Sequence, residues 1–105
     1  MDDDDVLPLS PTQGETTLAA QLGPDGLIAI DSALERHARP GRWLKVARVV
    51  ADALEAGGFS LSDDSHVELH VRRLIGLVES GLLEAQGDVR KPRWSEVRRP
   101  PSVPG

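Results

Sequence analysis

Two histidines four positions apart, His66 and His70, have a spacing that points to metal chemistry. Side chains at this spacing share one face of a helix and can bind one zinc ion. HVELH lacks the H-E-x-x-H order of zinc proteases, and no third ligand is fixed nearby, because Asp63, Asp64 and His37 could approach only through the fold. Two half-buried histidines flanking a helical core explain the pair more simply. We expect no metal and no cofactor.

Acidic side chains surround these histidines at Asp63, Asp64 and Glu68. Paired carboxylates can act as general acid and base. Acidic residues at the start of a helix also stabilise its dipole, and that is their ordinary role. The sequence has no G-x-S-x-G motif, no glycine-rich phosphate loop and no cysteine nucleophile. We therefore expect a protein that is not an enzyme.

Basic residues form a third group that could do chemistry. One pair lies on a predicted helix and a second set in a later loop: Arg72 and Arg73, then Arg90, Lys91 and Arg93 with Trp94 alongside. Such side chains contact phosphates, and an exposed tryptophan can stack on a base. From Asp63 to Glu79, however, four acidic residues outnumber two basic ones, whereas phosphate neutralisation usually dominates DNA affinity. Nucleic acid and protein both remain possible partners.

A helix over residues 65–80 positions many of these side chains. Its apolar residues recur at helical spacing and form one inward face: Val67, Val71, Leu74 and Val78, widened by Ile75 and Leu77. Ser65 and Glu68 have the spacing of a capping box, and Ser80-Gly81 is a stop signal. The opposite face carries Leu69, Arg72 and Arg73, which we expect to point outward.

Two earlier helices are predicted by the same periodicity. The first spans residues 24–38, with Asp25 as its N-cap, after a short helical turn over 16–22. The second spans residues 42–56, and its inward positions are Trp43, Ala47, Val50 and Leu54, with Val49 off this stripe. Phe59, in the following link, is expected to be buried.

After Gly81 the pattern alternates as in a strand. We expect a hairpin that pairs residues 82–86 with 93–98 across a basic loop over 87–92. Pro92 cannot donate to a strand ladder and is therefore placed in the loop or at the strand edge. Three helices followed by a hairpin predict an α+β, mostly helical, winged-helix-like domain with a C-terminal β-hairpin wing.

This arrangement resembles a bacterial winged-helix-like domain of unknown function, usually the C-terminal half of two-domain proteins. Trp43, the helix ending RRLIGLVESGLLEAQGD and the closing WSEVRRP carry the resemblance, which covers slightly over half the chain, from Trp43 to Pro100. The resemblance implies the fold and no activity. The sequence departs from that pattern because it has no large N-terminal partner domain.

Charge is distributed unevenly along the 105 residues. The first 30 contain six acidic and no Lys or Arg residues, whereas residues 89–99 contain five basic residues and one acidic residue. We expect a disordered acidic arm over 1–15, the winged-helix-like domain over 16–99 and a proline-rich tail over 100–105. No apolar run approaches the length of a membrane span, so a cytoplasmic protein with no membrane partner is expected.

The sequence therefore predicts a non-catalytic interaction module that binds a protein partner or itself, with nucleic acid as the alternative. No small-molecule substrate is evident. The predicted contact surface combines the outer face of the third helix with the basic loop: Leu69, Arg72, Arg73, Arg90, Lys91, Arg93 and Trp94.

Overall fold

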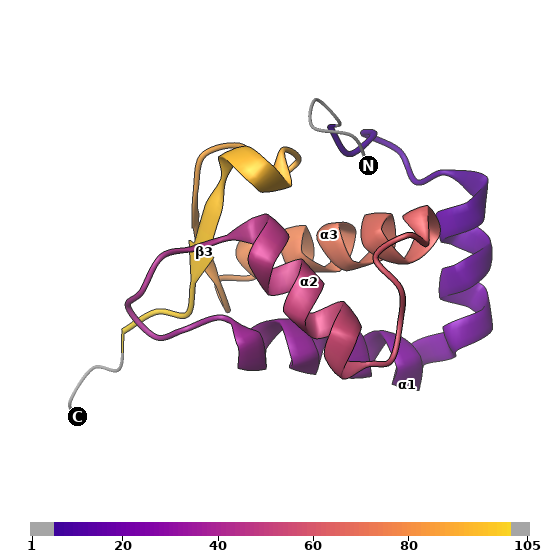
Figure 1. Cartoon of the computed structure of the whole chain (residues 1–105), viewed down its shortest axis with the longest axis horizontal. Coiled ribbons are helices and arrows are strands. Elements are labelled where there is room, and N and C mark those ends of the chain that lie inside the picture. Colours follow the sequence, from indigo (N-terminus) through magenta and orange to yellow (C-terminus); the bar gives the residue numbers. More distant parts are fainter. Residues whose placement is uncertain (1–5, 102–105) are drawn as a thin grey trace.

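Residues 6–101 are described by the computed structural model, and within them the chain forms three α-helices and a three-stranded antiparallel sheet (Figure 1). The elements follow the order α1 (Gln13–His37), β1 (Leu44–Lys45), α2 (Val46–Ala56), α3 (Asp64–Glu79), β2 (Glu84–Gln86), the 3-10 turn η1 (Pro92–Trp94) and β3 (Glu96–Arg98). This confirms the expected α+β, mostly helical class. None of the helices within 6–101 is long and apolar enough to cross a membrane.

Helix α1 is longer than expected and bends in the middle. It begins at Gln13, where the Thr12 side chain accepts a hydrogen bond from the Glu15 N–H at 3.2 Å. At Gly23 the backbone leaves helical geometry with φ of 69°, a conformation that glycine adopts without steric cost. Pro24 then opens the second half, where its missing N–H is tolerated. The bend therefore lies where the sequence analysis placed the start of a helix.

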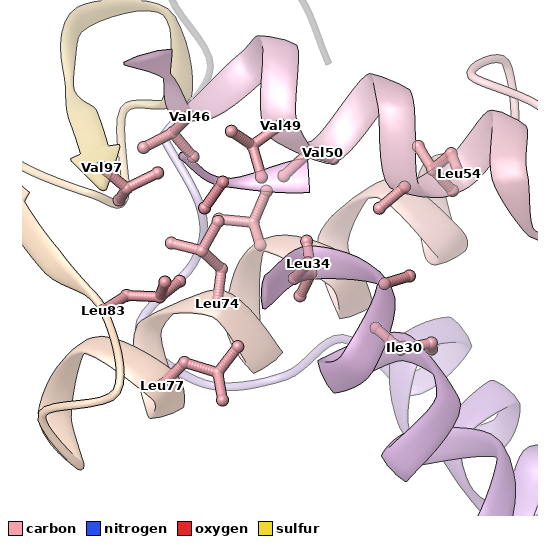
Figure 2. Close-up of a cluster of buried hydrophobic side chains, with 14 of the residues drawn as sticks. Ile30, Leu34, Val46, Val49, Val50, Leu54, Leu74, Leu77, Leu83 and Val97 are labelled. Carbon is pink, nitrogen blue, oxygen red and sulfur yellow. The ribbon is translucent and has the colours of Figure 1, made fainter. Parts of the chain in front are cut away.

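The hydrophobic core lies where the three helices meet the sheet (Figure 2). Val71 and Leu74 of α3 are fully buried, and Val67 and Val78 are partly buried against the same core. The inward stripe predicted for this helix is thus confirmed. Its partners come from α1, α2, the link before β2 and β3, and include Leu34, Leu54, Leu83 and Val97.

Helix α2 differs from its prediction at its start and in its buried face. Residues 44–45 form strand β1, and the helix begins only at Val46. Val49, expected beside the core stripe, is fully buried because α2 contacts α1, α3 and η1 and so buries a wide arc. Trp43 lies ahead of the strand, where its ring stacks under the Arg98 guanidinium at 4.5 Å.

The sheet has the order β1-β3-β2, and all its pairs are antiparallel. Strands β2 and β3 form the hairpin expected after Gly81, with Ala85 opposite Val97. Pro92 lies in the connection, as expected, but residues 92–94 form η1 and do not belong to the second strand. A Cβ at Gly87 would lie 2.9 Å from the Trp94 carbonyl oxygen, so this turn requires glycine.

The cap of α3 is Asp63, whose carboxylate accepts a hydrogen bond from the His66 N–H at 3.2 Å. The Ser65–Glu68 capping box is therefore wrong, because the helix begins one residue before Ser65 and places that serine inside the first turn. Glu68 instead accepts a hydrogen bond from the Thr12 hydroxyl at 3.1 Å. The stop at Gly81 is confirmed, with φ of 83° at that residue.

The segment ahead of α1 packs on the domain where a disordered arm was expected. Leu7 is fully buried, and its backbone N–H donates to the Arg90 carbonyl at 2.8 Å. The apolar residues of this segment, Val6, Leu7 and Leu9, have no periodicity that would reveal such docking. The rest of the expected arm, residues 1–5, and most of the tail, residues 102–105, lie outside the described residues.

Replacing Leu74 with alanine tests the position of the core. We expect Leu74→Ala to lower the free energy of unfolding by about 2–5 kcal/mol, because it leaves a cavity at a fully buried site. Ile28, 60% exposed on α1, provides the matched control, and Ile28→Ala should change stability by less than about 0.5 kcal/mol. Urea denaturation followed by circular dichroism measures both variants. Equal small effects would contradict the described core.

Candidate partner-binding surface

The two histidines form an aromatic cluster with Phe59, which is partly buried where a buried side chain was expected. His66 stacks on Phe59 at 4.0 Å between ring centroids, and His70 meets the same ring edge-on at 6.0 Å. Both histidines are more buried than expected, at 8% and 1% exposure. No group of three His, Cys, Asp or Glu side chains within residues 6–101 is arranged to hold a metal ion. The cluster joins the link that follows α2 to the first half of α3.

The protonation of His70 is constrained by this packing. Its Nδ1–H donates to the His66 carbonyl at 2.8 Å, because a carbonyl oxygen can only accept. Burial lowers the pKa of His70 below its ordinary value of 6.5, with a smaller opposing effect from that hydrogen bond and a further lowering by the charge of His66. The fold thus favours neutral His70.

This shift predicts how stability depends on pH. The unfolded chain protonates His70 near pH 6.5 while the folded chain does not, so unfolding takes up a proton and stability falls as pH decreases below 6.5. We expect His70→Leu to have a shallower decline between pH 7 and pH 5 than the native chain. Urea unfolding across this range measures both slopes. Parallel slopes would contradict a neutral buried His70.

The outer face of α3, predicted as a contact surface, is covered by α1. Leu69 is only 3% exposed, so the prediction that it points outward is wrong. Arg73 is held by Asp31 of α1 through two hydrogen bonds, Nε to Oδ1 at 2.9 Å and Nη2 to Oδ2 at 2.6 Å. These bonds raise the pKa of Arg73, chiefly because Asp31 accepts from its guanidinium. Arg73 therefore joins the two helices.

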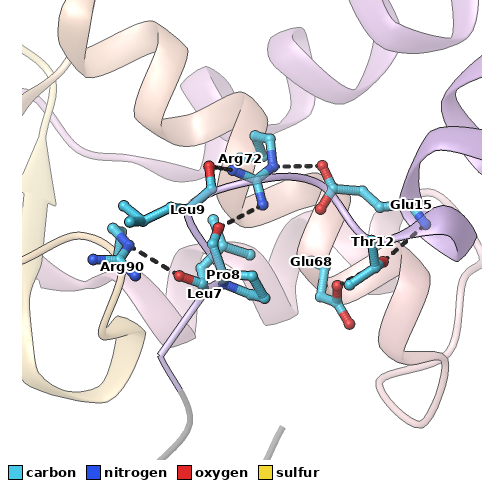
Figure 3. A network of polar contacts seen from close by, with 8 residues as sticks. All are labelled: Leu7, Pro8, Leu9, Thr12, Glu15, Glu68, Arg72 and Arg90. Carbon is cyan, nitrogen blue, oxygen red and sulfur yellow. Dashed lines mark hydrogen bonds and ion pairs between the residues drawn. The ribbon is translucent and has the colours of Figure 1, made fainter.

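Arg72 is also engaged within the chain (Figure 3). Its guanidinium forms an ion pair with the buried carboxylate of Glu15, at the start of α1. The same group donates to the Pro8 carbonyl at 2.8 Å and to the Leu9 carbonyl at 3.3 Å. Arg72 thus fixes both α1 and the segment before it onto α3. The prediction that Arg72 belongs to an open contact surface is therefore wrong, because its guanidinium is already occupied by these partners.

Glu15 and Asp31 are the ion-pair partners of Arg72 and Arg73, and the sequence analysis did not identify them. The signal for Glu15 was indirect: the first 30 residues contain six acidic residues, Glu15 among them, and no basic residue that could pair with it. Asp31 lies just past this stretch and had no such signal. Carboxylates buried on helices require cations from elsewhere in the chain. Arg72 and Arg73, adjacent on the predicted third helix, supply those cations.

The remaining predicted residues lie in the loop between β2 and β3, where their surroundings differ. The Arg90 side chain donates from Nε to the Leu7 carbonyl at 2.9 Å, so it helps to hold the N-terminal segment. Lys91, Arg93 and Trp94 lie on the surface, and Trp94 is 67% exposed. The Ser95 hydroxyl donates to the Lys91 carbonyl at 2.9 Å, which closes the loop around η1. Part of the predicted loop is therefore exposed at the surface.

A surface depression joins this loop to the start of α2. It is lined by what we call the α2–η1 patch: Lys45, Ala47, Leu61, Arg93 and Trp94. The Val46 N–H donates to the Ser95 carbonyl at 3.0 Å, which places the N-terminus of α2 beside η1. Leu61, which lies between Ser60 and Ser62, is 61% exposed and adds an apolar side chain to this surface. Apolar groups rimmed by cations are typical of interfaces.

Lys45, Ala47 and Leu61 were not among the predicted contact residues. The sequence signal for Leu61 was its isolation within the polar link between the second and third helices. Lys45 had no such signal, because its place beside Arg93 follows from the pairing of β1 with β3. The predicted set is thus divided: Leu69 is buried, Arg72 and Arg73 are half-buried and paired with carboxylates of α1, and Arg93 and Trp94 lie on the patch.

Comparison with known proteins gives no relative: no family model matches the chain, and no curated protein and no solved structure matches it.

The Arg72–Glu15 pair predicts a large cost for removing one partner. Arg72→Met leaves the Glu15 carboxylate buried without its cation, and we expect a loss of about 3 kcal/mol of stability. The double variant Arg72→Met with Glu15→Gln should recover most of this loss, because the buried charge is removed too. Urea unfolding measures all three chains.

The matched control for that experiment is Arg48→Met. Arg48 and Asp52 form an exposed pair at 3.8 Å on α2, and its loss should cost less than about 1 kcal/mol. If Arg72→Met and Arg48→Met have similar effects, the ion pair does not hold α1 on α3.

Proposed function

We propose that this chain is a non-catalytic, winged-helix-like interaction module that binds a protein partner through the α2–η1 patch. The order of its elements supports the winged-helix assignment: a helix, a short strand, two helices and then a hairpin whose second strand, β3, pairs with the first strand, β1. In this assignment α2 and α3 are the helix-turn-helix pair, and the β2–β3 connection with η1 is the wing.

The exposed ring of Trp94 is the observation that carries the proposal. The Trp94 side chain is 67% exposed and therefore leaves a large apolar area in water. The side chains that the core buries are much smaller than this one. Leu61 and Ala47 extend this apolar area, and Lys45 and Arg93 border it. Tryptophan and arginine are the residues most enriched at the energetic centres of protein interfaces.

A protein partner is favoured over DNA by the state of α3. A recognition helix reads a major groove with an accessible face, but here Arg72 and Arg73 are committed to Glu15 and Asp31. Glu68 adds negative charge near the start of the same helix. The nucleic-acid alternative rests on the patch, where Trp94 could stack on a single-stranded base beside Lys45 and Arg93.

A photo-crosslinking amino acid at position 94 tests the proposal in the cell. We expect it to capture one protein species, identified by mass spectrometry, because this position is the centre of the contact. The matched control carries the same amino acid at Ile28, which is 60% exposed on α1 and lies outside the patch. Capture from position 94 and not from position 28 supports the proposal.

The remaining outcomes separate the alternatives. A crosslinked second copy of this chain, with a concentration-dependent sedimentation coefficient, identifies self-association as the protein contact. Crosslinks to nucleic acid, together with salt-sensitive oligonucleotide binding that Arg93→Ala abolishes, would replace the proposal with the alternative. Capture of the same species from both positions, or no capture from position 94, would overturn it.

A further inference from the structure

We propose that a depression inside the bend of α1, which we call the elbow pocket, binds a small uncharged molecule with an apolar body and one N–H or O–H donor. The lining of the pocket comes from α1, from α3 and from the turn that follows α3, and it includes Glu15, Leu27, Leu69, Gly76, Leu77 and Leu82. None of these residues lines the α2–η1 patch, so the inference goes beyond the proposed function and does not depend on it.

The bend of α1 creates the elbow pocket against α3 (Figure 1). Glu15 belongs to the half of α1 before Gly23, and Leu27 belongs to the half after it, so both halves line the same depression. Its volume is about 460 Å³. Pockets for small molecules usually have volumes of about 300–1,000 Å³ and a mostly apolar lining with a few polar groups. The elbow pocket therefore has the size and the composition of a small-molecule site.

The buried carboxylate of Glu15 supplies the polar contact. One oxygen of this carboxylate, Oε2, pairs with Arg72 (Figure 3). The other oxygen, Oε1, is buried and has no hydrogen-bond partner among residues 6–101. A buried acceptor without a partner costs free energy, and only a donor can satisfy it. An N–H or O–H group of a molecule in the elbow pocket is the donor that we infer for Oε1.

Gly76 provides an independent observation, because its backbone does not require a glycine. It lies inside α3 with ordinary helical geometry, a setting in which alanine is more stable than glycine. A Cβ at position 76 would have no atom within 4 Å apart from its chain neighbours and the backbone of its own helix. The glycine therefore leaves open a space in the wall of the pocket that any other residue would fill, and a ligand can use that space.

The charges that line the pocket favour an uncharged ligand. Arg72 is paired with Glu15 and Arg73 with Asp31, so the charges of these four lining residues sum to zero. A cationic ligand at Oε1 would be repelled by Arg72, and an anionic ligand would be repelled by the Glu15 carboxylate. A neutral donor avoids both repulsions, while its apolar body contacts the leucines of the pocket.

Two matched probes test the inference with the native chain. Indole has an apolar ring system with one N–H donor, and benzofuran has the same shape with an oxygen in place of the N–H. We expect indole to bind on the order of tenfold more tightly, because only indole can donate to the charged carboxylate. Titration followed by amide NMR should shift the resonances of Gly76 and Leu77 saturably. The side-chain N–H resonance of Trp94, on the α2–η1 patch, should not shift.

Two substitutions at Gly76 test the open space. Gly76→Leu fills the elbow pocket and should abolish indole binding. Gly76→Ala should weaken indole binding and raise the urea midpoint, because alanine is the better helix former, and it decides the test if Gly76→Leu does not fold. The matched control is Glu55→Leu, which adds a leucine at an exposed position of α2 outside the pocket and should bind indole as the native chain does.

The contrary outcomes are distinct from a failure of the proposed function. Equal affinities for indole and benzofuran overturn the inference, since Glu15 then accepts nothing from the ligand. Absence of saturable indole binding, or indole binding that is unchanged in both Gly76 variants, also overturns it. A urea midpoint lowered by Gly76→Ala would mean that position 76 is not open, which removes the space for the ligand. The proposed function is judged separately, by the crosslinks from position 94.

Discussion

The ion pair between Arg72 and Glu15 is the interaction on which the arrangement of the chain depends. It joins the middle of α3 to the first turn of α1, two positions 57 residues apart in the sequence. Because the Glu15 carboxylate is buried, its separation from Arg72 would leave a charge without a partner in an apolar setting. The same guanidinium holds the Pro8 and Leu9 carbonyls, so Arg72, together with Arg90 at Leu7, fixes where the N-terminal segment lies.

This constraint explains why α3 is buried on two sides. Its Val71 and Leu74 face packs into α2 and the sheet, and its Leu69 face is covered by the bent α1. Because two faces of α3 pack against other elements, the helix leaves little surface for a partner. The contact surface that we propose therefore lies elsewhere, on the α2–η1 patch, where Trp94 and Leu61 are exposed.

Periodicity predicted the parts of the fold that depend on one buried face. The stripe through Val71 and Leu74 and the reversal after Gly81 follow from local spacing and from glycine geometry, and both are confirmed. Strand β1 has two residues and no alternation, so it exists only because β3 pairs with it. The covering of Leu69 by α1 is likewise a tertiary effect that no local pattern contains.

In the candidate site too, some residues were identifiable from a local pattern and others are brought in only by tertiary contacts. Arg93 and Trp94 were identifiable because a basic loop with an aromatic residue is a local pattern. Their neighbour Lys45 is 48 positions earlier, and only the sheet register brings it beside them. The charge imbalance of the first 30 residues indicated that Glu15 needs a cation from elsewhere, but composition alone does not identify Arg72 as that partner. The pairing of Arg73 with Asp31, which lies outside that stretch, had no such indication.

The docking of Leu7 beside Arg90 also determines where added peptide would emerge. An affinity tag or fusion protein joined at the N-terminus would leave the fold next to η1 and could obstruct whatever approaches Trp94. Residues 99–101 lie at the opposite end of the molecule from the N-terminal segment (Figure 1). Immobilisation through the C-terminus therefore leaves the α2–η1 patch facing solution, and this orientation suits any surface-based assay.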